Sequence, residues 1–169
     1  NVEIDLPTVV SDTTPPIFDV TPATSNVTAT TVDLSASLDE AGKIYYVVVA
    51  DGATAPTIAQ IKAGQDSSGA SALKSGNSDV TTTPFTGTYN ITGLSANTAY
   101  DIYVVGQDDE GTPNVMASAT KVDVTTTTLN ITFDFESNVT GFDTTDVRQT
   151  VSNETLKVIS STAHMDGAI

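Results

Sequence analysis

Apolar and polar residues alternate in several short stretches between residues 17 and 128. In residues 32–38, apolar side chains occupy every second position and Asp or Ser the positions between them. This period of two is typical of a strand that buries one face. Residues 43–50 (KIYYVVVA) form a nearly continuous apolar run, which predicts a central strand covered on both faces. Further strands are expected at 17–20, ended by Pro22, and at 84–92, 99–107 and 115–124, with a weak fragment at 72–73.

The segment between residues 51 and 80 has a different pattern. Residues 56–64 predict a short helix, with Pro56 in its first turn, Thr54 as its N-cap and Gly64 at its end. Ile58 and Ile61 lie three positions apart on one helix face, so we expect them to close one end of a core. Residues 65–79 are rich in Ser and Gly and predict a loop.

The order of these elements indicates the fold class. About seven short strands separated by turns fill residues 17–128, and only one short helix interrupts them. This spacing favours an all-β antiparallel sandwich over an alternating α/β arrangement.

One stretch resembles a known family. Residues 93–108 (GLSANTAYDIYVVGQD) are similar to the fibronectin type III segment that links the fifth strand to the sixth. There a Leu packs under a turn and a Tyr six residues later forms the tyrosine corner; Leu94 and Tyr100 have that spacing. The resemblance implies an immunoglobulin-like, fibronectin type III-like sandwich over residues 12–128, with a helix inserted after its third strand. The usual Trp of the second strand is absent, so Val32 or Leu34 must fill its space.

The remaining residues predict neighbouring units. Residues 1–11 are the expected end of a preceding segment or linker. Residues 129–142 (LNITFDFESNVTGF) are similar to the opening of secreted jelly-roll modules, including several carbohydrate-binding ones. Residues 129–169 are too few to bury a sandwich core alone, so they predict the N-terminal part of a second β-sandwich module.

Composition excludes several classes of function. The chain has 21 acidic and 6 basic residues among 169, a formal charge of −15, which argues against nucleic acid or an anionic membrane surface as a partner. It has no Cys and one His, so most catalytic constellations cannot be assembled and no enzymatic activity is expected. No apolar run approaches the roughly 18 residues of a membrane-spanning helix. Its 30 Thr favour strands and, with the acidity, suggest an exported bacterial protein.

Two kinds of candidate site remain. Asp108, Asp109 and Glu110 in one turn offer the oxygen ligands that a structural calcium ion takes; a solvated acidic turn is the alternative. The jelly-roll resemblance adds candidate calcium ligands in the second module: Asp134, Glu136 and Asp143. The sequence Asp-Thr-Thr at 12–14 and 143–145 resembles the O-glycosylation signal of exported Bacteroidetes proteins, which implies sugar on Thr13 and Thr144.

The leading hypothesis is a non-enzymatic structural or adhesive spacer in a large secreted or cell-surface bacterial protein. Its partners would be neighbouring modules of the same chain or neighbouring copies. One alternative is an accessory region of a secreted polysaccharide-degrading enzyme, which would bind polysaccharide through the second module. Another is the subunit of an extracellular filament assembled by strand addition.

Overall fold

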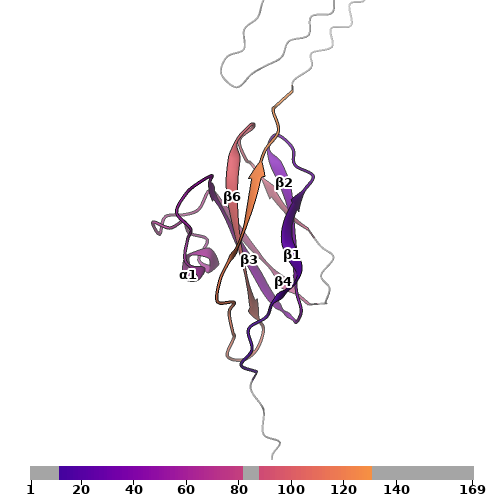
Figure 1. The fold of residues 1–169 in the computed structure, drawn as a ribbon, viewed down its shortest axis with the longest axis vertical. Helices are drawn as coiled ribbons and strands as arrows, with labels where there is room; N and C mark the ends of the chain where they lie inside the picture. The colour runs from indigo at the N-terminus through magenta and orange to yellow at the C-terminus, as the bar shows by residue number, and fades with distance from the viewer. Residues whose placement is uncertain (1–11, 82–87, 131–169) are drawn as a thin grey trace, which may run out of the picture. The chain divides into compact units, whose positions relative to one another are not determined.

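Two antiparallel sheets form the module. A computed structural model describes residues 12–81 and 88–130 of the chain. The first sheet has the strand order β1-β2-β5 and the second the order β4-β3-β6-β7 (Figure 1). The all-β antiparallel sandwich with one short helix is therefore confirmed. The elements are β1 (Phe18–Ser25), β2 (Thr31–Leu38), β3 (Gly42–Ala50), α1 (Ile58–Lys62), β4 (Lys74–Val80), β5 (Tyr89–Thr92), β6 (Ala99–Asp108) and β7 (Thr120–Thr125).

The main core lies between the two sheets. The alternating apolar residues of β2 are all buried, as the period of two predicted; these are Val32, Leu34, Ala36 and Leu38. On β6, Gly106 faces this strand closely, because a Cβ atom added to it would lie 2.5 Å from Cδ2 of Leu38. Only glycine lets the two sheets approach here without moving the leucine.

Strand β3 is buried on both faces. Val47, Val48 and Val49 follow one another and are each at most 3% exposed, which confirms the double coverage predicted from the apolar run. One face looks toward the other sheet. The opposite face is covered by α1, which lies against β3 and β6 outside the sandwich (Figure 1). Ile61 is 1% exposed under this helix, and the Lys62 ammonium lies 5.7 Å from the centre of the Tyr45 ring. We had expected the helix to close one end of the core. Instead it covers a face of the second sheet.

Helix α1 is shorter than its pattern predicted. It spans Ile58–Lys62, and its N-cap is Thr57 rather than Thr54. The Gln60 amide donates to the Thr57 hydroxyl at 3.3 Å, and the Thr57 amide donates to the Gln60 side-chain oxygen at 2.8 Å. This capping box satisfies two N-terminal amides that the helix leaves unpaired, and it places the N-cap three residues later than predicted.

Two strands at sheet edges differ from their predicted positions. Strand β1 continues through Pro22, where the sequence predicted its end, because its register with β2 shifts between Val20 and Ala23. A proline without an amide hydrogen is tolerated at such an irregularity on an edge strand. Strand β4 lies at Lys74–Val80, so all but its last residue fall in the predicted loop, and it does not include residues 72–73. Its sequence is polar, so hydrophobic alternation does not reveal it.

The last strand is also shorter than predicted. Strand β7 begins at Thr120, whereas the expected strand began at Val115. Val115 makes only an isolated bridge to Gln107, and the Met116 amide donates to the Gly106 carbonyl at 3.1 Å. Val115 and Met116 thus contact β6 without joining the ladder that β7 forms with it.

The chain enters and leaves the module at opposite ends. Just before β1, the Ile17 amide donates to the Asp39 carboxylate at 2.8 Å, beside the turn that follows β2. Just after β7, the Thr127 amide donates to the Thr28 carbonyl at 3.0 Å, in the turn that follows β1. These contacts mark an N-terminal pole and a C-terminal pole, separated by the length of the strands (Figure 1). The division between compact units falls between Thr127 and Thr128.

The layer formed by α1 gives a first prediction. We expect Ile61→Ala to lower the free energy of unfolding by about 2–5 kcal/mol, because it empties a fully buried site between the helix and the sheet. Urea unfolding followed by tyrosine fluorescence measures this change. Leu73→Ala is the control, since Leu73 is 56% exposed and its truncation should cost less than about 0.5 kcal/mol. Equal midpoints for the two variants would show that α1 adds nothing to the core.

Candidate functional site

The residues of the predicted tyrosine corner lie in the turn between β5 and β6 and at the start of β6. Leu94 and Tyr100 are both 6% exposed. The Tyr100 hydroxyl accepts a hydrogen bond from the Ser95 amide at 2.9 Å. The buried phenol therefore has a polar partner, and the turn is held against the strand that follows it. This contact is structural and has no open face for a ligand.

The predicted calcium ligands lie at the N-terminal pole but do not converge. Asp108 is buried, and both of its carboxylate oxygens accept hydrogen bonds from Asn114, at 2.8 Å from the amide and 2.9 Å from the side chain. Asp109 and Glu110 are exposed. Asn114 also donates to the Asp12 carbonyl at 3.2 Å, so the turn holds the segment that leads into β1. Asn114 acts as a donor here, whereas a calcium ligand must offer oxygen.

Negative charge is concentrated at this pole. The pKa of Glu40 is raised above its usual value, mainly by burial and then by nearby carboxylates, of which Asp12 and Asp39 act most strongly. Protonation of Glu40 would relieve part of this repulsion. The pole is therefore an acidic surface held together by hydrogen bonds from Asn114.

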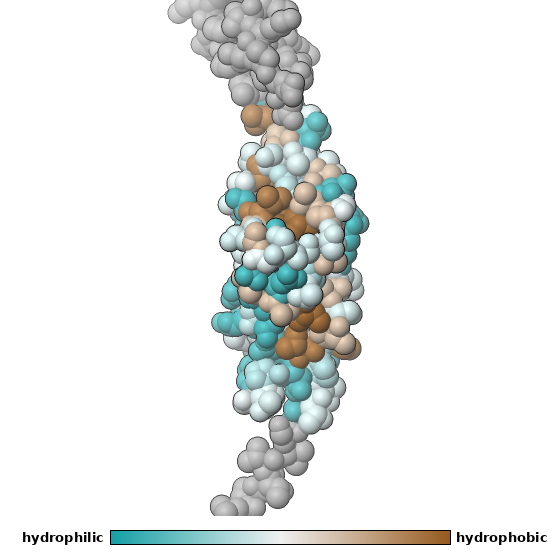
Figure 2. Space-filling view, turned by 90° about the vertical axis from the view of Figure 1, so that its left-hand side faces the viewer, coloured by the Kyte–Doolittle hydropathy of each residue, from teal (hydrophilic) through white to brown (hydrophobic). Residues whose placement is uncertain are grey.

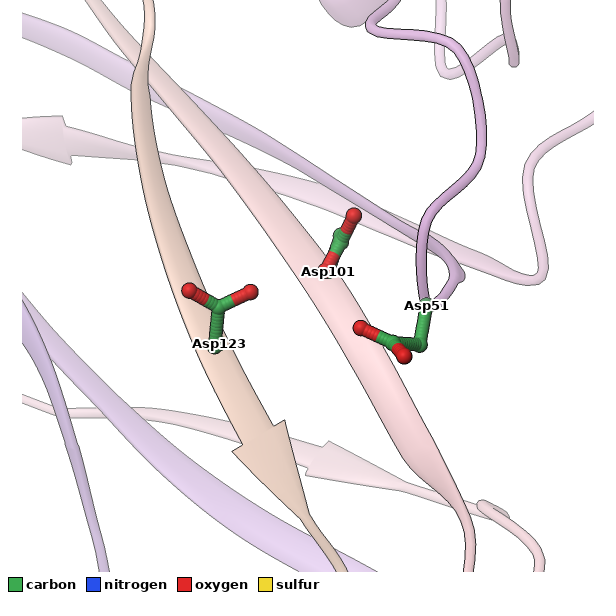
Figure 3. Close-up of side chains that lie close together, drawn as sticks. All are labelled: Asp51, Asp101 and Asp123. Atoms are coloured by element: carbon green, nitrogen blue, oxygen red, sulfur yellow. The ribbon is translucent and has the colours of Figure 1, made fainter.

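A different trio of carboxylates does converge. Asp51 lies in the turn after β3, Asp101 on β6 and Asp123 on β7, and ligand oxygens from the three lie within 4.8 Å of one another (Figure 3). Asp101 is only 1% exposed, and one of its oxygens accepts from the Gly52 amide at 3.2 Å. Asp101 and Asp123 are register partners and so share a face of the second sheet. Gly106, five positions along β6 from Asp101, faces Leu38 of the first sheet, so the two aspartates point away from that sheet.

Lys121 supplies the positive charge that this trio requires. Its ammonium nitrogen lies 3.0 Å from Oδ1 of Asp101 and 2.7 Å from Oδ1 of Asp123. The contact with Asp101 is ionic, since that oxygen lacks hydrogen-bond geometry. The contacts with the carboxylates of Asp123 and then Asp101 raise the pKa of Lys121. The hydrogen bond from Lys121 is the main cause that lowers the pKa of Asp123.

This arrangement is an ion-pair network that joins β6 to β7. A metal ion at the same place would have to displace Lys121. Sequence reasoning missed the network, although Lys121 and Asp123 stand two positions apart and so share a strand face. What the sequence could not give is the register that sets Asp101 opposite Asp123, or the turn that brings Asp51 beside them.

The candidate glycosylation sites are only partly described. Thr13 is exposed in the segment before β1, where the Thr14 amide donates to the Asp12 carboxylate at 2.8 Å. Thr144 lies outside the described residues, as do the second-module candidates Asp134, Glu136 and Asp143.

Comparison with known proteins adds little to this picture. No family of known proteins matches the chain, and no curated protein does. Among solved structures, the chain is similar to a computer-based redesign of a β-sandwich protein. The identity is 15%, the match covers 72% of this chain and 97% of that one, and the TM-score is 0.42. The β-sandwich assignment above therefore rests on the two sheets themselves.

Within residues 12–81 and 88–130, no helix has the length and apolar character needed to cross a membrane.

The ion-pair network gives a second prediction. We expect Lys121→Met to lower the urea midpoint, because it leaves the buried Asp101 carboxylate beside Asp123 without a counter-charge. Lys43→Met is the matched control: it breaks the Lys43–Asp79 pair, in which both side chains are exposed, and should cost less. Adding Asp101→Asn to Lys121→Met should recover part of the loss. A double variant that is no more stable than Lys121→Met alone would contradict this account.

A third prediction concerns acid. The pKa of Asp33 is lowered by hydrogen bonds from the Asn90 side chain, at 2.7 Å, and from the Asn26 side chain, at 2.8 Å. The unfolded chain therefore binds more protons, so this stabilisation is present above the unfolded pKa and is lost as the pH falls through the lowered folded value. We expect the urea midpoint of Asn90→Ala to fall less than that of wild type between about pH 5 and pH 2. Parallel curves for the two proteins would contradict the assignment.

Proposed function

We propose that this chain is a non-enzymatic spacer segment of a large secreted or cell-surface bacterial protein, with its described module of the fibronectin type III-like kind. The observation that carries the proposal is the entry and exit of the chain at opposite poles of one sandwich. Modules of this geometry extend a protein when they are joined in series. The ten residues of β6, at about 3.3 Å each, indicate a spacing of roughly 33 Å per module.

The surface of the module supports this role. Figure 2, which looks onto the side that carries α1, shows small, separate apolar patches among polar residues. Of the described residues, the large apolar side chains that are exposed are Ile17, Val20, Leu73 and Leu129. None of these is aromatic, whereas a sugar-stacking platform needs an exposed ring. A solvated surface of this kind suits a module that separates others rather than one that binds a ligand.

The candidate chemistry also favours a spacer. The trio of carboxylates is neutralised in part by Lys121 and joins two strands. A hollow of about 140 Å³ between the end of α1 and β4, lined among others by Ile61, Gly64 and Ser75, is smaller than the roughly 300 Å³ at which ligand pockets begin.

The two alternative functions depend on other parts of the chain. The carbohydrate-binding alternative depends on residues 129–169, and the filament alternative depends on both ends of the chain. Apart from Leu129 and Asn130, these residues lie outside the described ones.

The proposal predicts that the module is replaceable. In the parent protein, residues 12–127 are exchanged for an unrelated β-sandwich of equal length whose ends also lie at opposite poles. An epitope tag is placed before Asn1, and antibody access to it is measured on intact cells. We expect the exchange to keep the access seen in wild type and deletion of residues 12–127 to reduce it.

Two controls accompany this exchange. A sandwich whose two ends lie at the same pole should behave like the deletion, because it adds mass without length. Protease treatment of intact cells should release peptides of this chain into the medium. Peptides found only after cell lysis would refute surface location, and loss of tag access in the opposite-pole exchange would show that the native module has a specific ligand.

A further inference from the structure

Hydrogen bonds are concentrated where the chain leaves the module. Thr126 is 2% exposed, although it stands in a run of four threonines whose other members are exposed. Its hydroxyl donates to the Ser95 carbonyl at 2.6 Å, with the Thr98 carbonyl as a second acceptor at 3.1 Å. The same hydroxyl accepts from the Thr98 amide at 3.0 Å, and the Thr126 amide donates to the Thr98 carbonyl at 3.0 Å. One side chain thus binds both ends of the turn before β6.

The next residue connects this turn to the other sheet. The Thr127 amide donates to the Thr28 carbonyl at 3.0 Å, and the Thr127 carbonyl accepts from the Asn97 amide at 2.9 Å. Thr28 lies in the turn between β1 and β2, the two strands that are neighbours in the first sheet. We call this set of hydrogen bonds the C-terminal clamp; its members are Thr28, Ser95, Asn97, Thr98, Thr126 and Thr127. The clamp therefore joins both sheets at the last two residues before the boundary between units.

The clamp lies on the path of any tension through the chain. Force that pulls on the C-terminal side arrives first at Thr127 and then at β7, which is an edge strand bonded to β6 alone in its sheet. Since β7 ends at the C-terminal pole, such force acts along the strand and shears its whole ladder with β6 at once. The clamp lies at the end of this ladder where the force enters the module, so its bonds carry the load together with the ladder and ahead of it along the chain.

We propose that the C-terminal clamp is a mechanical latch, in which the Thr126 hydroxyl sets the force at which the module opens under end-to-end tension. This goes beyond the proposed spacer role but rests on it for its biological meaning, because only a tethered spacer carries tension. Thr126 is itself buried, and its hydroxyl bonds the partly buried Ser95 carbonyl and Thr98 amide, so its removal would take this partner from both groups.

The test is single-molecule force spectroscopy on the full chain with handles at Asn1 and Ile169. At constant force, we expect Thr126→Val to unfold about tenfold faster than wild type, because the rate of forced unfolding reports the bonds that are lost before the barrier. Thr126→Ser keeps the hydroxyl and should restore most of the wild-type rate. Thr127→Val makes the same change at the adjacent exposed side chain and should unfold at the wild-type rate.

A second pulling geometry separates a latch from general stability. The chain has no Cys, so Gly111→Cys gives a unique attachment in the turn between β6 and β7, at the N-terminal pole. Pulling between Asn1 and this position leaves the C-terminal clamp off the path of force. We expect Thr126→Val to accelerate unfolding much less here than in end-to-end pulling. Equal acceleration in both geometries would overturn the latch and leave an ordinary stabilising contact.

The remaining outcomes also decide the question. If Thr126→Val does not fold, a second variant replaces it. Thr127→Pro removes the amide that donates to the Thr28 carbonyl. Thr128→Pro is its control, because it makes the same change one residue beyond the clamp. Faster end-to-end unfolding of Thr127→Pro alone supports the latch, and equal rates overturn it. These experiments use the chain outside its parent protein, so their failure is distinct from failure of the exchange experiment that tests the spacer role.

Discussion

The fold depends on the burial of β3 on both faces. Three consecutive valines leave this strand with no side that tolerates water, so it must lie inside a sheet and between two covering layers. The strand has β4 and β6 as neighbours, the first sheet covers one face, and α1 covers the other. The helix is therefore more than an insertion between two strands. It is the third layer that makes the most apolar segment of the chain possible in a small sandwich.

Covering both faces of the central strand also limits what the module can bind. Once α1 lies over β3 and β6, the broad middle of that sheet is closed, and polar groups have room only at the strand edges and the two poles. The Asp101–Lys121–Asp123 network lies toward the edge strand β7, the Asn114 contacts lie at the N-terminal pole, and the Thr126 contacts lie at the C-terminal pole. All three hold backbone segments or strands together. These three sets of polar contacts thus fix the ends of the module and its last strand.

Hydrophobic pattern predicted the parts of this structure that bury apolar surface and missed the parts that polar residues determine. Strand β2 and the doubly covered β3 follow directly from their sequences, because burial imposes the period. Strand β4 has no such pattern, because it is a polar edge strand whose position is set by pairing with β3. The start of α1 depended on a choice between Thr54 and Thr57, which the side chain of Gln60 decides. The carboxylate trio required the register of β6 with β7, which is a long-range property that no local pattern encodes.

The four threonines at residues 125–128 show how one residue type can serve two purposes at a module boundary. Their composition predicts a linker, yet Thr126 is buried and bonded on two sides. A β-branched side chain favours the extended backbone needed at the end of β7, and its hydroxyl forms hydrogen bonds to backbone groups that a valine cannot form. The neighbouring threonines keep the same extended preference while facing water. A run of identical residues can therefore end a folded unit firmly at one position and continue as solvated chain at the next, and burial at Thr126 makes the difference.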